Sequence, residues 1–180
     1  FAQALALKPD DPEIRFNYSL TQLHLGNDAE GWRHYEARWQ LERQKKRSFP
    51  QPWWHGGPFA GRTLLLFAEQ GFGDTIQFIR FAPQVKALGG RVVLECQPEL
   101  MRLMASAEGV DELVVRDTAE AEAMLRAADL VCPLASLPGI FRASVMTLPQ
   151  SADWWPARRS APARQARQAF QFFRPWSLPR

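Results

Sequence analysis

The side chains best suited to chemistry lie in one short glycine-containing stretch, FAEQGFGDTIQF, at residues 67–78. Gly71 and Gly73 are followed at once by an acid, Asp74, and the pattern after Asp74 is that of an amphipathic helix. A phosphate-binding turn, a catalytic acid at a helix start and a helix cap without chemistry all have this layout. The residues around the stretch decide between these three interpretations.

Neither of the common nucleotide-binding motifs fits this stretch. In a Rossmann fingerprint the third glycine allows close packing of helix on strand, and Ile76 occupies that position here. Glu95 lies about where the ribose-binding acid of that fingerprint would be, but it does not replace the missing glycine. A P-loop fails as well, because no Gly-Lys-Ser/Thr follows. We therefore expect no bound cofactor.

Asp74 is the remaining candidate for chemistry. An Asp in the first turn of a helix interacts well with the free N–H groups and the dipole, so a cap alone would explain it. The residue also follows an apolar run, and ligands of open α/β sheets bind beyond the carboxyl ends of the strands. A carboxylate held ionised there could accept the proton of a substrate hydroxyl. Cap and general base both stay open.

The elements that must position Asp74 alternate between strands and helices. Thr63–Ala68 is a continuous apolar run, as in a parallel strand buried on both faces. Further strands are expected at 91–96, 112–115 and 129–133, and helices at 74–88, 98–105 and 119–128, with Gly89-Gly90 ending the first helix. Residues 63–150 are therefore expected to form an α/β, Rossmann-like domain with a mostly parallel sheet.

Residues 1–47 read as helices separated by two breaks, KPDDP and GND. Asp11 is placed to cap a helix whose first residue is Pro12. The layout resembles the tetratricopeptide repeat, a helical hairpin with small residues at the helix contact, here Ser19 and Gly31. About one and a half repeats fit, and the chain does not start with Met, so we expect it to be a piece of a longer protein.

Residues 48–62 form a linker rich in proline and glycine between the helices and the strands. Aromatic side chains gather in and just before this linker. They fit either a platform on which sugars stack or a hydrophobic joint between the two parts; the joint is favoured, because stacking residues normally lie on the open side of a site. These aromatic residues are Trp32, Tyr35, Trp39, Phe49, Trp53, Trp54 and Phe59.

Charge, histidine and cysteine usage argue against several classes of protein. The formal net charge is +3, but without the six arginines of residues 154–180 it is −3, so nucleic acid is not an expected partner. The three histidines lack metal-ligand spacing, so no metal is expected. Cys96 and Cys132 lie in apolar runs without C-x-x-C spacing, which is typical of reduced, buried thiols in a cytoplasmic protein. No apolar run reaches the roughly 18–20 residues of a membrane span.

Residues 151–180 differ in character from the rest, with no acid after Asp153 and no clear periodicity. Two interpretations stay open for this Arg- and Pro-rich tail: a disordered segment, or a segment translated from a shifted reading frame in GC-rich DNA. Sequencing the gene through the Asp153 codon distinguishes them, because an intact frame there excludes the frameshift.

A longer string, W-x-G-x-x-x-x-G-R-T-L-L-L-x-x-E-Q-G-F-G-D-T-I-Q-F-I-R-F from Trp54, carries a family resemblance. It resembles bacterial proteins that join tetratricopeptide repeats to a glycosyltransferase domain. Those domains are similar to the family 9 heptosyltransferases and, more distantly, to O-GlcNAc transferase. The resemblance covers residues 1–150 and implies the N-terminal half of a GT-B fold, in which two Rossmann-like domains face each other across a cleft.

The resemblance implies that Asp74 is the general base that deprotonates the acceptor hydroxyl. The glycines of the loop would shape the acceptor side, two glutamines would hydrogen-bond sugar or phosphate, and a serine after the fourth strand would line the cleft. These substrate-binding residues are Gln70, Gly71, Gly73, Gln77 and Ser136. The donor would be a nucleotide-sugar used as a co-substrate without a metal, in keeping with the lack of a D-x-D motif.

The family continues past this region into a donor domain, where this chain carries the Arg- and Pro-rich tail instead. We therefore expect a glycosyltransferase fragment that is inactive alone. Its partners would be an acceptor glycan or protein in the cleft and a protein on the helical repeats. The alternative is a non-catalytic interaction scaffold built on those repeats.

Overall fold

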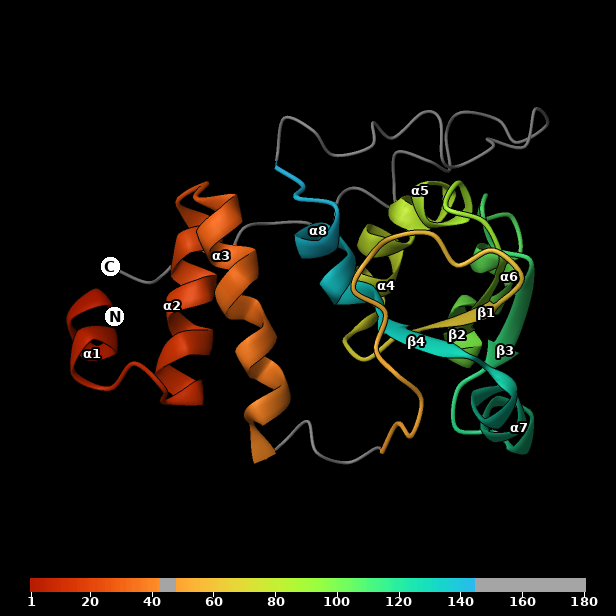
Figure 1. The fold of residues 1–180 in the computed structure, drawn as a ribbon, viewed down its shortest axis with the longest axis horizontal. Coiled ribbons are helices and arrows are strands. Elements are labelled where there is room, and N and C mark those ends of the chain that lie inside the picture. The colour runs from red at the N-terminus through yellow and green to blue at the C-terminus, as the bar shows by residue number, and fades with distance from the viewer. Residues whose placement is uncertain (43–47, 145–180) are drawn as a thin grey trace.

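The computed structural model describes residues 1–42 and 48–144, and it places a group of helices beside a unit that contains a sheet (Figure 1). The end of the predicted 1–47 hairpin, the end of the predicted 63–150 domain and the whole predicted 151–180 tail lie outside the described residues. The N-terminal group consists of α1 (Ala2–Leu7), α2 (Pro12–His24), α3 (Asp28–Tyr35) and the 3-10 helix η1 (Glu36–Gln40).

Helix α2 begins as the sequence predicts. The Asp11 carboxylate accepts hydrogen bonds from two backbone N–H groups of the first turn, at 3.0 and 3.1 Å, and Pro12 occupies the first helical position, where no N–H is needed. Helices α2 and α3 pack side by side, and a Cβ at Gly31 would lie 2.6 Å from the Leu23 side chain, so glycine permits this close approach. The helix pair is present, while its identity as a tetratricopeptide repeat stays a prediction.

Four parallel strands form the sheet, in the order β3-β2-β1-β4. Leu65 of β1 pairs with Val93 on one side and Val131 on the other, and all three are fully buried. The predicted α/β class with a parallel sheet is confirmed, because a central strand covered on both faces is apolar throughout. Each strand ends within one residue of its predicted bounds: β1 (Thr63–Phe67), β2 (Arg91–Cys96), β3 (Glu112–Val115) and β4 (Leu130–Pro133).

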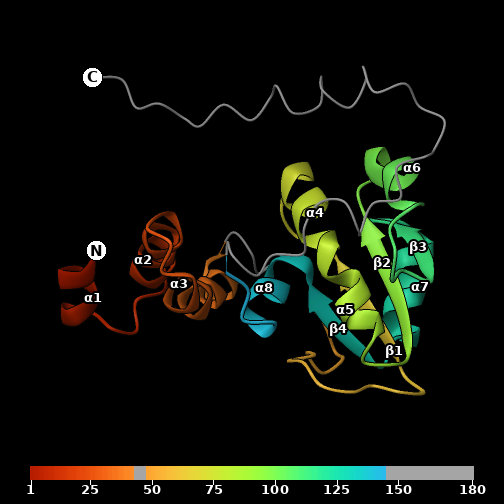
Figure 2. The ribbon, with the colours of Figure 1, turned by 90° about the horizontal axis from the view of Figure 1, so that it is seen from above.

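Helices cover both faces of the sheet (Figure 2). Among the described residues, several helices pack on the face that carries Leu64 and Leu66, and α7 (Ala119–Ala127) packs on the face that carries Leu65 and Val93. This two-sided cover makes the sheet a buried layer whose strand ends are the open edges. The first face holds α4 (Phe72–Phe78), α5 (Ala82–Lys86) and α6 (Met101–Met104).

The single helix predicted over 74–88 is wrong in two respects. The helix starts earlier, at Phe72, and the 3-10 helix η3 (Ile79–Phe81) separates α4 from α5. Pro83 explains the separation, because it lacks a backbone N–H and its ring crowds the carbonyl four residues earlier. Gly89–Gly90 end the helical region as predicted, and both residues have a positive φ.

The aromatic residues of the linker form a joint between the N-terminal helices and the sheet. The rings of Trp39 and Trp53 lie 4.8 Å apart, and Phe49 stacks on Phe67 of β1 with the ring centroids 4.3 Å apart. The backbone N–H of Trp54 donates to the carbonyl of Val131 at 2.8 Å, so the linker runs along the β4 edge of the sheet. The predicted hydrophobic joint is confirmed for these rings.

The two cysteines are buried and free, as the sequence predicts. Burial raises the pKa of Cys96 to about 11, with the Glu95 charge adding to this effect and Arg116 opposing it. Burial also raises the pKa of Cys132 well above its ordinary value. Within residues 1–42 and 48–144, no helix is both long enough and apolar enough to cross a membrane.

Candidate functional site

The carboxyl ends of β1 and β4 form the switch point of the sheet. The chain leaves β1 toward β2 and β3 and then returns to β4 on the other side of β1. In open α/β sheets the crevice at such a point is where ligands bind. The loop 68–71 after β1 and the 3-10 helix η5 (Leu134–Ser136) after β4 flank it here. The six predicted site residues all lie in these two segments or in α4.

Asp74 caps helix α4 and remains half-buried. Its Oδ2 accepts a hydrogen bond from the backbone N–H of Gly71 at 3.1 Å, so the predicted cap is confirmed. Its other oxygen, Oδ1, accepts no hydrogen bond from the residues that the structure describes. Gly71 has a φ of −73°, which any residue adopts, so this turn does not itself require glycine.

Gln97, which lies just beyond β2, holds the loop that precedes α4. It is 2% exposed, and its Nε2 donates to the backbone carbonyl of Gln70 at 3.0 Å. Its Oε1 accepts from Thr75 Oγ1 of α4, also at 3.0 Å. Gln70 therefore contributes its backbone to this contact, whereas Gly73 and Gln77 are exposed on α4. The two hydrogen bonds of the buried Gln97 side chain, here called the Gln97 clamp, hold the loop and α4 to the end of β2.

Ser136 belongs to a hydrogen-bonded polar group, here named the Arg38 cluster, whose members are Glu36, Arg38, Glu69 and Ser136. The side chains of Arg38 and Glu69 are buried, whereas that of Glu36 is 47% exposed. The Arg38 guanidinium donates to Glu36 at 2.7 Å, to Glu69 at 3.0 Å and to Ser136 Oγ at 2.8 Å. The Ser136 hydroxyl in turn donates to Glu36 at 2.8 Å. Because Glu69 follows β1 and Ser136 follows β4, Arg38 of η1 bridges the two sides of the switch point.

Burial determines the electrostatics of the Arg38 cluster. The side chain of Arg38 is 0% exposed and that of Glu69 is 5% exposed. Burial raises the pKa of Glu69, and the nearby Arg38 charge counters only part of this rise. Burial would lower the pKa of Arg38, but the Glu36 and Glu69 carboxylates raise it above its ordinary value. A single guanidinium thus serves two carboxylates.

The Tyr35 phenol interacts electrostatically with both Asp74 and the charged members of the Arg38 cluster. The guanidinium carbon of Arg38 lies 4.6 Å from the centroid of the Tyr35 ring. Burial raises the pKa of Tyr35 to about 12; the Arg38 charge opposes this rise, and the carboxylates of Glu69, Asp74 and Glu36 add to it. The Asp74 charge therefore affects the pKa of the same buried phenol as the charges of the Arg38 cluster.

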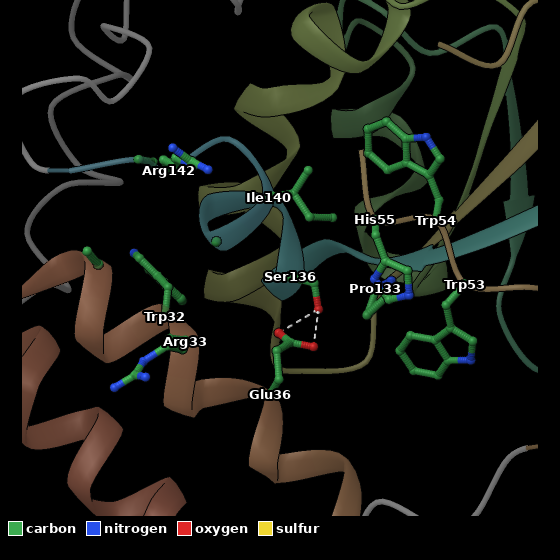
Figure 3. A pocket seen from close by; sticks show the side chains of 13 residues that line it. Trp32, Arg33, Glu36, Trp53, Trp54, His55, Pro133, Ser136, Ile140 and Arg142 are labelled. Carbon is green, nitrogen blue, oxygen red and sulfur yellow. Dashed lines mark hydrogen bonds between the residues drawn. The ribbon is translucent and has the colours of Figure 1, made fainter. Parts of the chain in front are cut away.

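A cavity of about 640 Å³ opens beside the Arg38 cluster, between α3 and the linker segment 53–55 (Figure 3). Gly139 and Ile140 of helix α8 (Leu137–Ile140) also line it. Of the six predicted site residues, Ser136 lines this cavity, whereas Asp74 and the loop that precedes it do not. Its lining includes Trp32, Glu36, Trp53, Trp54, Ser136 and Ile140.

Ionisable side chains at this sheet edge include Asp74, Tyr35 and the charged members of the Arg38 cluster, together with Arg116, which donates to the Ala68 carbonyl at 3.1 Å. In the described part of the chain, no three side chains of His, Cys, Asp or Glu converge as metal ligands would. The ionisable side chains named here can take part in proton transfer, ion pairing and hydrogen bonding.

Comparison with known proteins shows a similarity over part of the chain. The chain is similar to protein FlbA of Caulobacter vibrioides, with 33% identity over 94 residues. The match covers 48% of this chain and 16% of FlbA, so the chain spans a small part of that protein's length. No family model matches the chain, and no solved structure matches it.

Glu36, Arg38, Glu69 and Gln97 are not among the site residues predicted from the sequence. One signal for Arg38 was present, because it follows Tyr35 by three positions on the helical face that becomes buried. Its partner Glu69 lies 31 residues further along the chain, and Ser136 lies 98 residues further. Pairing over such separations leaves no pattern in a single sequence.

Proposed function

We propose that this chain is the acceptor-side part of a glycosyltransferase, which moves a sugar from a nucleotide-sugar to an acceptor hydroxyl. The proposal includes the GT-B arrangement and the tetratricopeptide-type helices that the sequence resemblance implies. The observation that carries it is the position of Asp74, in the first turn of α4 and beside the switch point of a parallel sheet. A donor half outside the described residues would hold the nucleotide.

The reaction assigned to this edge needs one base. Asp74 accepts the proton of the acceptor hydroxyl, and the acceptor oxygen forms a bond to the anomeric carbon of the sugar. The bond from that carbon to the nucleotide phosphate oxygen breaks, and its electron pair leaves with the phosphate. No electron carrier is required, because nothing is oxidised or reduced.

The geometry of Asp74 suits this role. Oδ2 is held by the Gly71 N–H, so the carboxylate has a fixed direction, while Oδ1 is left for the acceptor hydroxyl. The Gln97 clamp holds the loop on its other side. A base fixed before substrate binds avoids the entropic cost of being positioned in the transition state.

Replacement of Asp74 by Asn tests the proposal in the intact gene product. Asn keeps an oxygen that can accept from the Gly71 N–H, so α4 still starts correctly, but it cannot take a proton. We expect Asp74→Asn to lower kcat by about 10²–10⁴ while the thermal unfolding temperature stays unchanged.

The matched control is Asp129→Asn. Asp129 Oδ2 likewise accepts from a backbone N–H, that of Thr63 at 2.8 Å, but it lies at the opposite, amino end of the sheet. We expect this variant to retain wild-type kcat. Turnover by Asp74→Asn that equals that of Asp129→Asn would leave Asp74 as a helix cap and refute the role of base.

A non-catalytic scaffold is the second candidate. One observation favours it: Arg38 of the N-terminal helices lies at the switch point, where ligands of such sheets bind. Its guanidinium donates to Glu69 on one side and to Ser136 on the other. A thermal shift assay of the intact gene product with UDP-, GDP- and ADP-sugars separates the two functions, because a bound ligand stabilises by mass action. A transferase shows a shift with at least one donor, and a scaffold shows none.

A further inference from the structure

We infer that the cavity between α3 and the linker segment 53–55 binds a neutral saccharide, with Glu36 accepting its hydroxyl groups and tryptophan rings contacting its ring carbons. Asp74 does not line this cavity, so the inference goes beyond the proposed transfer chemistry and does not depend on it. The site shares Ser136 with the predicted substrate-binding residues and adds Glu36, Trp32 and Trp53, which the transferase proposal does not include. Trp53 also belongs to the aromatic joint.

The cavity has the size and position of a ligand site. Its volume of about 640 Å³ falls within the range of about 300–1,000 Å³ that small-molecule sites occupy. It lies beside the carboxyl end of β4, with Pro133 and Ser136 in its wall. The N-terminal helices and the sheet unit both contribute to it, and junctions between such parts are common locations of ligand sites.

Glu36 is a carboxylate fixed in place by buried donors. The Ser136 hydroxyl lies 2.8 Å from Glu36 Oε1 and 3.0 Å from Oε2, and Arg38 donates to Oε1 at 2.7 Å. Ser136 is 7% exposed and Arg38 is 0% exposed, yet the Glu36 side chain is 47% exposed toward the cavity. Figure 3 shows this carboxylate beside Ser136 at the cavity wall. Oε1 already accepts from two donors, so Oε2 is the oxygen with a lone pair left to accept from a ligand hydroxyl.

Two tryptophans stand on opposite sides of the cavity, Trp32 on α3 and Trp53 on the linker (Figure 3). Trp32 packs edge to face against Tyr35, with the ring centroids 5.3 Å apart. Trp53 packs in the same manner against Trp39 at 4.8 Å. These contacts limit the movement of both rings. The electron-rich face of an indole attracts the weakly positive C–H groups of a sugar ring.

The charges of the wall favour a neutral ligand. Glu36 is already ion-paired with Arg38, so its carboxylate can accept hydrogen bonds from a ligand without a cation bound to it. Arg33 lines the same cavity and is ion-paired with Glu30 at 2.6 Å. An anion would meet the Glu36 carboxylate, and an ammonium group would meet Arg33 and Arg142. A hydrocarbon would offer no donor to the acceptor capacity that Glu36 retains beside its bonds to Arg38 and Ser136.

Isothermal titration calorimetry of the purified chain tests the site. The probes are the methyl glycosides of glucose, galactose, mannose and N-acetylglucosamine, with cellobiose and chitobiose. We expect saturable binding of at least one probe. Glu36→Gln and Trp32→Ala should each raise the dissociation constant by about tenfold or more. The first variant loses a charge-assisted hydrogen bond, and the second loses a ring contact.

Two further variants keep the test decisive. Ile140→Trp adds a large ring at a cavity-lining position outside the Arg38 cluster and should abolish binding, even if Glu36→Gln unfolds the chain. Asp129→Asn, at the amino end of the sheet, does not line the cavity and should leave binding unchanged. Absence of saturable binding with every probe overturns the inference, as does binding that Ile140→Trp leaves intact. Asp74→Asn should bind as wild type, so the saccharide site and the transfer chemistry fail or succeed separately.

Discussion

Replacement of Arg38 by Met should destabilise the chain severely. The guanidinium is fully buried and donates to Glu36, Glu69 and Ser136 at 2.7–3.0 Å. Met fills much of the same volume but leaves the 5%-exposed Glu69 carboxylate buried without its counter-ion. Removing one partner of a buried ion pair costs about 3–5 kcal/mol, because the other charge remains desolvated.

Urea unfolding measures this loss. With a slope of about 2 kcal/mol/M, the expected loss of about 3–5 kcal/mol lowers the midpoint by about 1.5–2.5 M. The double variant Arg38→Met/Glu69→Gln removes the stranded charge and should recover most of the loss, which makes the coupling between the two residues measurable.

Arg33→Met is the matched control. Arg33 also forms an ion pair, with Glu30 at 2.6 Å, but the two side chains are 67% and 38% exposed. Its replacement should cost about 0–1 kcal/mol despite the shorter distance, because water screens an exposed pair. A loss for Arg38→Met no larger than that for Arg33→Met would refute the reasoning, as would a double variant no more stable than Arg38→Met.

Two further predictions concern pH and backbone geometry. Because burial raises the pKa of Glu69 in the folded state above its ordinary 4.5, its contribution to stability is present below that value and lost as pH rises. The free energy of unfolding of Glu69→Gln, measured relative to wild type, should therefore increase as pH rises above 4.5; a constant difference would exclude the shift. Gly90→Ala should destabilise by about 2–4 kcal/mol in thermal unfolding, since its φ is +91° and a Cβ would lie 2.6 Å from the Arg62 carbonyl. Gly57→Ala, with the same φ and no atom within 4 Å of the new Cβ, should cost about 1 kcal/mol; equal losses would show that the close contact contributes nothing.

The strands could be predicted from the sequence because a parallel strand covered on both faces is apolar throughout. TLLLF and RVVLEC are such runs, and both are observed as predicted strands of the sheet. The helix that follows β1 could not be bounded as well. Its apolar spacing continues through Pro83, so periodicity alone does not reveal the 3-10 segment that precedes this proline.

The candidate site was predicted in part. The loop with Asp74 lies at the expected sheet edge, and its capping role could be inferred from an acid after two glycines. The Arg38 cluster could not, because its hydrogen bonds join residues from η1, the loop after β1 and η5. The cavity beside it exists only because the N-terminal helices pack against the sheet unit, a contact with no local sequence pattern.

Transfer of a sugar to an acceptor is the most direct measurement of the central claim. The intact gene product is incubated with the UDP-, GDP- and ADP-sugar panel and a lysate of its source organism, and acceptors whose mass grows by one glycosyl unit are counted by mass spectrometry. We expect glycosylated products from wild type and Asp129→Asn, and a loss of about 10²–10⁴ in the rate of their formation with Asp74→Asn. Equal product from Asp74→Asn and wild type, or no product from wild type with any donor, would contradict the assignment of Asp74 as the base of a glycosyltransferase.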